Sequence, residues 1–176
     1  MNKRGYTVMN KSTSTYLDLI RFVAAFIVFA SHAAGARLTG HWKATTFTGA
    51  LRLSGMTAPF VYDGPMNGAV FRAYVEQVLL PTLTPGHVTI MDNLPAHKAA
   101  GVRDAIEQAG AKLLFLPPYL PDFNPIENAF SKLKAMLRAK AERTINALWD
   151  TVGKLVDQFS PRECANYFSA AEYESD

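Results

Sequence analysis

Two short apolar runs, separated by a segment of helical length, constrain the fold of this 176-residue chain more than any other feature. The first covers residues 87–91 and is rich in β-branched side chains, which is typical of a buried strand. The second covers residues 113–116 and ends at two consecutive prolines, which cannot continue a strand ladder. A helix is expected between them, over residues 98–109, because Gly110 then ends it. This alternation predicts a mixed α/β sheet flanked by helices.

Further elements are expected on both sides of this unit. Upstream lies a predicted hairpin over residues 45–61, followed by a helix that begins after Asn67 and ends before Pro81. Downstream, three helices are expected: one opened by Asn124 and Pro125, one over residues 144–159, and one opened by a capping box at Ser160. Trp149 and the Tyr167-Phe168 pair are expected to pack these helices on the sheet.

An acidic residue follows each of the two apolar runs. Asp92 comes directly after the first, and Glu127 lies in the first turn of the helix that follows the second. Carboxylates are the ligands that Mg2+ prefers, so two of them meeting at one sheet edge predict a magnesium site. Local explanations compete with this one. Glu127 also fits a capping position three residues after Asn124, and Asp92 with Asn93 also fits a turn.

Two motifs in a fixed order surround these carboxylates. They are Met91-Asp-Asn-Leu-Pro-Ala-His97 and Leu116-Pro-Pro-Tyr-Leu-Pro-Asp-Phe-Asn-Pro-Ile-Glu127, preceded by Gly-His-Trp-Lys at 40–43 and Asp-Gly-Pro-Met-Asn at 63–67. From about Gly40 to Tyr173 the chain resembles the mariner-like DDE transposases of bacterial insertion sequences. The resemblance implies a ribonuclease-H-like catalytic domain, here truncated, that cleaves and transfers DNA strands with Mg2+ or Mn2+. Its implied catalytic and metal-binding residues are Asp92 and Glu127.

The resemblance implies a third carboxylate, on an early strand, which this chain does not match. Asp18 is the only acidic residue before Asp63, and neither matches the metal-binding position of the family. Loss of one of three anionic ligands weakens affinity for the metal, so we expect an impaired enzyme. The alternatives are a catalytically inactive remnant that binds DNA or dimerises, as a homodimer or with a complete transposase, and a membrane-anchored fusion fragment.

Several polar residues near the carboxylates are candidate DNA contacts. Basic side chains can neutralise phosphates, although the same pattern also suits a solvated helix face. Asn93 and His97 match recurrent positions of the family, so they could orient Asp92 or contact a phosphate. His97 could instead cap the following helix. The candidate DNA-binding residues are therefore Asn93, His97, Lys132, Lys134, Arg138 and Lys140.

Composition excludes some classes of function. A single cysteine, Cys164, excludes an internal disulfide and is expected to be a small buried residue. The chain contains no glycine-rich phosphate loop and no Gly-x-Ser-x-Gly motif, which argues against nucleotide-dependent and serine-hydrolase chemistry. The net charge of +3 is modest, so affinity for DNA would depend on local basic clusters.

The first 36 residues differ in kind from the rest. About 15 uncharged positions begin at Phe22 and follow scattered basic residues, as in a signal peptide or membrane anchor. As a helix this run would reach about 22 Å, short of a hydrocarbon core of about 30 Å. Residues 16–36 also resemble the first membrane helix of integral-membrane acyltransferases. An insertion element that landed in an acyltransferase gene would explain both resemblances.

These observations predict the organisation of the chain. Residues 1–36 are expected to be an unrelated N-terminal apolar segment, helical in structure, and residues 37–176 a partial transposase catalytic domain. A cytoplasmic location is expected, with membrane contact through residues 17–36 as a further expectation.

Overall fold

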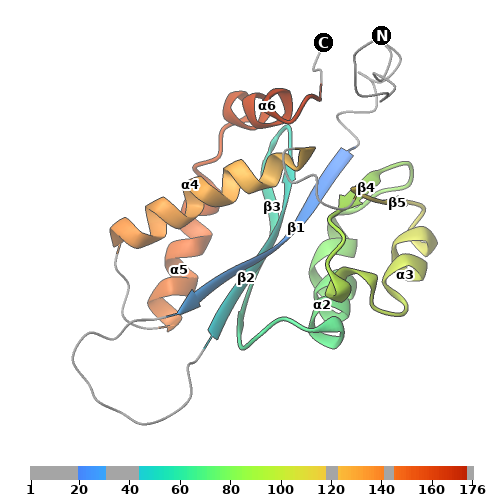
Figure 1. The fold of residues 1–176 in the computed structure, drawn as a ribbon, viewed down its shortest axis with the longest axis horizontal. Coiled ribbons are helices and arrows are strands. Elements are labelled where there is room, and N and C mark those ends of the chain that lie inside the picture. The colour runs from blue at the N-terminus through green and yellow to red at the C-terminus, as the bar shows by residue number, and fades with distance from the viewer. Residues whose placement is uncertain (1–19, 31–43, 118–122, 141–144, 174–176) are drawn as a thin grey trace.

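The computed structural model describes residues 20–30, 44–117, 123–140 and 145–173, which form a five-stranded sheet flanked by helices (Figure 1). The strands are β1 (Ile20–Ala30), β2 (Ala44–Arg52), β3 (Gly55–Asp63), β4 (Val88–Met91) and β5 (Lys112–Phe115). The α-helices are α2 (Gly68–Tyr74), α3 (Val102–Gln108), α4 (Pro125–Lys140), α5 (Ile145–Val156) and α6 (Pro161–Ala170). A π-helical turn (Val75–Leu79) and 3₁₀ turns at Leu80–Thr82 and Pro95–Lys98 complete the described elements.

The sheet is mixed, with strand order β3-β2-β1-β4-β5. β1 pairs with β2, and β2 with β3, in antiparallel fashion, whereas β1–β4 and β4–β5 are parallel. In the parallel part Val23 is paired with Met91, and Met91 with Phe115. The carboxyl end of β4 therefore lies beside β1 well before β1 ends. The expected mixed α/β sheet is confirmed.

The central strand β1 corrects one expectation. The apolar segment was predicted to be a helix outside the sheet, but Ile20–Ala30 is a strand that pairs on both sides. Phenylalanine, valine and isoleucine make up most of this strand, and aromatic and β-branched residues favour strands. Without it, the inner edges of β2 and β4 would have unpaired backbone groups. The expected boundary at residue 36 lies outside the described residues.

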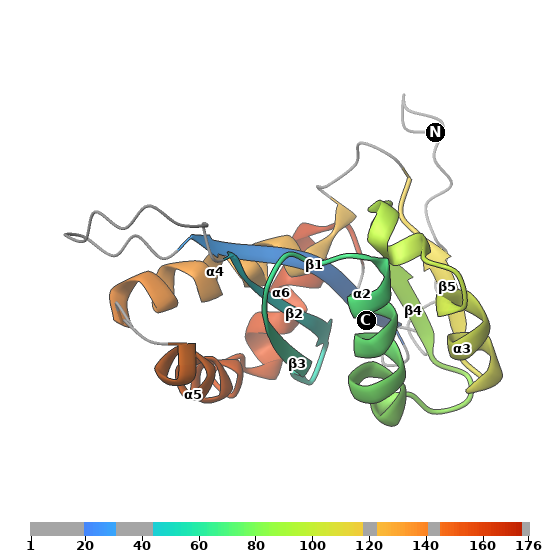
Figure 2. The ribbon, with the colours of Figure 1, turned by 90° about the horizontal axis from the view of Figure 1, so that it is seen from below.

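Two apolar clusters cover the two faces of the sheet. Figure 2 shows α4 and α5 on one side of the sheet and α2 and α3 on the other. Side chains alternate between them, since neighbouring residues of a strand point to opposite faces. Ile90 belongs to the cluster under α4, and Met91 to the cluster under α2 and α3. On β2, Leu51 likewise belongs to the cluster under α4, and Ala50 to the cluster under α2 and α3.

Several predicted helix starts are confirmed. Asn67 caps α2, where its Oδ1 accepts hydrogen bonds from the backbone N–H groups of Ala69 and Val70, both at 3.0 Å. α4 begins at Pro125, as expected. Ser160 caps α6, since its Oγ accepts from the Glu163 N–H at 3.3 Å. These starts were predictable because capping depends on side chains within one turn.

Other expectations need adjustment. The helix expected over residues 98–109 is a 3₁₀ turn followed by α3, because Gly101 takes a left-handed conformation (φ +83°) between them. Trp149 was expected in the core, but it is 47% exposed. Phe168 and Cys164 are fully buried, as predicted. Across the part of the chain that the structure describes, no helix has the length and apolar character needed to span a membrane.

We predict that a chain shortened to residues 37–176 loses cooperative unfolding, because β2 and β4 then lose the strand that joins them. Urea unfolding followed by circular dichroism would measure this. A chain that starts at residue 16 keeps β1 and serves as the control. An unchanged unfolding midpoint in the 37–176 chain would contradict the place of β1 in the sheet.

Candidate metal centre

Asp92 lies at the carboxyl edge of the sheet, one residue after the end of β4. Its Oδ1 accepts a hydrogen bond from the Leu94 backbone N–H at 3.0 Å, which closes a tight turn. The same oxygen lies 2.6 Å from Nδ1 of His97. The Asp92 side chain is 25% exposed, so its carboxylate remains open to solvent on one side.

The structure places both neighbours of Asp92 around its turn. His97 lies on the 3₁₀ turn Pro95–Lys98 and is fully buried, with its ring centroid 4.2 Å from that of Phe71. Asn93 donates a side-chain hydrogen bond to the Leu116 carbonyl, which joins the ends of β4 and β5. An enclosed imidazole is poorly placed to contact a phosphate. The geometry of His97 therefore favours the orienting role over a DNA contact.

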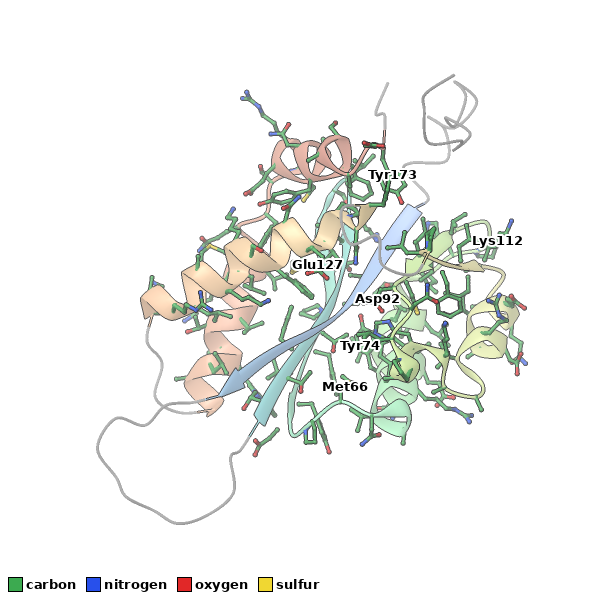
Figure 3. The ribbon with its side chains drawn as sticks, viewed as in Figure 1. Met66, Tyr74, Asp92, Lys112, Glu127 and Tyr173 are labelled. Atoms are coloured by element: carbon green, nitrogen blue, oxygen red, sulfur yellow. The ribbon has the colours of Figure 1, made fainter. Side chains whose placement is uncertain are left out.

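Glu127 lies in the first turn of α4, and its carboxyl group interacts electrostatically with Asp92. Desolvation raises the pKa of Glu127 above its ordinary value, Lys134 partly offsets this rise, and the Asp92 charge adds to it. Figure 3 shows the labelled Asp92 and Glu127 side chains close to β1. A divalent cation placed between two such carboxylates would offset their like charges.

β1 lies between the elements that carry the two carboxylates, since it pairs with β4 and α4 packs against it. Extended by one residue beyond the pair Val23–Met91, the parallel register would bring position 24 beside Asp92. That position is Ala24, and β1 contains no aspartate or glutamate. Among the described residues, no group of three His, Cys, Asp or Glu side chains could hold a metal ion.

The donor set fits one divalent cation of the magnesium type. Mg2+ is usually held in proteins by one or two carboxylates, with water and substrate phosphate in the remaining positions. Asp92 and Glu127 supply two carboxylates of this kind. A pair of metal ions bridged by a third carboxylate is not supported by the described residues.

The basic residues of α4 divide into two groups around the helix. At about 100° per residue, Lys134 and Arg138 lie within about 20° of Glu127, whereas Lys132 and Lys140 are turned about 140° away. The effect of Lys134 on the pKa of Glu127 agrees with this placement. A basic row therefore extends from Glu127 along one side of α4.

Lys132 has a different role from this row. Its Nζ lies 2.6 and 2.7 Å from the two carboxylate oxygens of Glu163, and 4.7 Å from the centre of the Phe159 ring. Although desolvation raises the pKa of Glu163, hydrogen bonds from Lys132 and Tyr167 hold it below its ordinary value. Lys132 thus connects α4 to α6. The sequence contained no signal for this pairing, because 31 residues separate Lys132 from Glu163.

Comparison with known proteins gives one family and a consistent set of folds. A family model described as DDE superfamily endonuclease matches residues 31–148. A crystal structure of a pre-cleavage Mos1 transpososome matches with a TM-score of 0.66 and 16% identity, over 92% of this chain and 54% of that one. The chain thus spans about half the length of that relative. No curated protein sequence matches.

Catalytic-domain structures match over more of their length. The catalytic domain of Mos1 mariner transposase gives a TM-score of 0.63 at 16% identity, over 92% of this chain and 79% of that one. The Mos1 transposase catalytic domain with raltegravir and Mg gives 0.64 at 16% identity, over 93% and 82%. At such identities the likeness shows the fold alone, and the expected ribonuclease-H-like fold is confirmed.

Proposed function

Because this chain belongs to the DDE superfamily endonucleases, whose family model matches more than half of it, we propose that it acts in DNA transposition by metal-dependent strand cleavage and strand transfer. The observation that carries this proposal is the placement of Asp92 at the end of β4 and of Glu127 in the first turn of α4, two elements that both contact β1. Two partly desolvated carboxylates beside a basic helix suit a cation bound to a phosphodiester. DNA is the proposed substrate and partner.

Asp92 and Glu127 would hold Mg2+ or Mn2+ in this proposal. A divalent cation bound there would polarise a phosphodiester and favour the deprotonated form of the attacking hydroxyl. Asp92 is oriented for this by its turn, and Glu127 projects from the start of a helix packed on the sheet. Mos1 catalytic-domain structures with Mn and with Mg support the choice of ion.

The absence of an acidic residue from β1 supports the further proposal that catalysis is impaired. Two carboxylates offset less of the cost of metal dehydration than three, so affinity for the ion should be lower. The same observation favours a second candidate function, a catalytically inactive protein that binds DNA or dimerises. Cleavage assays separate the two candidates.

The first experiment measures nicking of supercoiled plasmid with Mg2+ or Mn2+. We expect slow nicking by the wild type and none by Asp92→Asn, because the substitution removes a ligand charge. Ala24→Asp places a carboxylate beside Asp92 and should raise the nicking rate at least tenfold. Ala30→Asp, roughly 20 Å further along the same strand, is the matched control and should not.

Two results would contradict this proposal. Equal nicking by the wild type and Asp92→Asn would trace cleavage to a contaminating nuclease. Equal effects of Ala24→Asp and Ala30→Asp would show that the register beside Asp92 does not define the metal site. Complete absence of nicking in the wild type, with DNA binding retained, would favour the inactive candidate.

DNA binding has its own matched pair of variants, Lys134→Gln and Lys132→Gln, which each remove one positive charge from α4. Fluorescence anisotropy with duplex DNA at several salt concentrations should show a slope of log K against log[salt] reduced by about one for Lys134→Gln. Lys132→Gln should keep the wild-type slope and lower the free energy of unfolding by about 1 kcal/mol or less, because it breaks the Glu163 pair. An equal reduction of the salt-dependence slope in both variants would contradict the proposal that Lys134, and not Lys132, lies on the side of α4 that contacts DNA.

A further inference from the structure

The contacts of Asp92 distinguish its two carboxylate oxygens. Both described partners, the Leu94 N–H and His97 Nδ1, contact Oδ1. No hydrogen bond from a described residue reaches Oδ2, and the side chain as a whole is 25% exposed. Because two contacts on one oxygen restrict rotation about the last side-chain bond, the plane of the carboxylate is set by the protein.

The position of His97 is itself fixed by packing. Its imidazole is fully buried and lies against Phe71, which is also fully buried in the cluster under α2 and α3. A backbone hydrogen bond from the His97 N–H to the Leu94 carbonyl, at 3.0 Å, closes the 3₁₀ turn. The apolar core on one face of the sheet thus holds a ring nitrogen against a carboxylate at the edge of that sheet.

We propose that His97 is a positioning residue, which holds Asp92 through Oδ1 so that Oδ2 is presented to a divalent cation. This inference rests on the metal site of the proposed function. It excludes phosphate contact as a role of His97 and leaves that contact to exposed residues. The separation of 2.6 Å between Nδ1 and Oδ1 is that of a direct contact between a ring nitrogen and a carboxylate oxygen. An imidazole with no exposed surface would reach a phosphate only if the turn at Pro95–Lys98 opened.

Outer contacts of this kind have a measurable effect on metal binding. A carboxylate that is already oriented loses less conformational freedom when it binds a cation. Removal of the partner that orients a metal ligand typically weakens metal affinity by 10- to 100-fold. The inference therefore predicts an effect on metal affinity that loss of packing alone would not produce.

Two variants at position 97 test whether the N–H donor of His97, apart from the packing of its ring, orients Asp92. His97→Asn keeps an N–H donor near the Nδ1 position, and His97→Leu has a similar branched shape without a donor. Both lose the ring contact with Phe71, so their unfolding midpoints in urea should fall by similar amounts. Mn2+ affinity, measured by titration with electron paramagnetic resonance, should fall less than about threefold in His97→Asn and at least about tenfold in His97→Leu.

Crystal structures of the two metal-free variants provide a readout that does not need metal. We expect the Asp92 carboxylate to keep its orientation in His97→Asn and to turn in His97→Leu. Equal Mn2+ affinities in the two variants, or an unchanged Asp92 in His97→Leu, would overturn the positioning role. A wild type that binds no Mn2+ would instead count against the proposed metal site, and the two crystal structures would then decide the role of His97.

Discussion

The pairing of β1 with β2 on one side and with β4 on the other is the interaction on which the rest of the structure depends. It joins an antiparallel hairpin to a parallel strand–helix–strand unit in one sheet. The ladder also brings the end of β4 beside the strand on which α4 packs. The elements that carry Asp92 and Glu127 are both held by this one strand, since it pairs with β4 and contacts α4.

The elements that sequence analysis predicted correctly are those decided by local signals. The hairpin, β4, β5 and the helix starts at Asn67 and Pro125 follow from β-branched runs, turns and caps within a few residues. The state of Ile20–Ala30 was not decided locally, because a continuous apolar run suits a buried strand as well as a helix. Its strand state comes from pairing with β2 and β4. Trp149 shows the converse, since its type favoured burial and its place on α5 leaves it exposed.

The site shows the same division. The role of Asp92 and Glu127 as metal ligands stays a prediction. Their positions in the fold were predictable, because each follows a recognisable strand or cap and the resemblance of their motifs to a family supplied their order. The separate role of Lys132 among the basic residues of α4 was not predictable, because it depends on a contact with Glu163 in another helix. Phe71, which supports the His97 ring, had only the signature of a core residue. The origin of residues 1–36 in an acyltransferase gene and a dimeric state both stay predictions.

A crystal structure of the protein grown with Mn2+ would test the central claim most directly, that Asp92 and Glu127 share one cation. Anomalous diffraction from manganese locates the ion independently of how the protein is built into the density. We predict one peak in contact with the carboxylates of both residues, with Oδ2 as the Asp92 ligand. No peak at this edge of the sheet, or a peak bound to only one of the two side chains, would contradict the account.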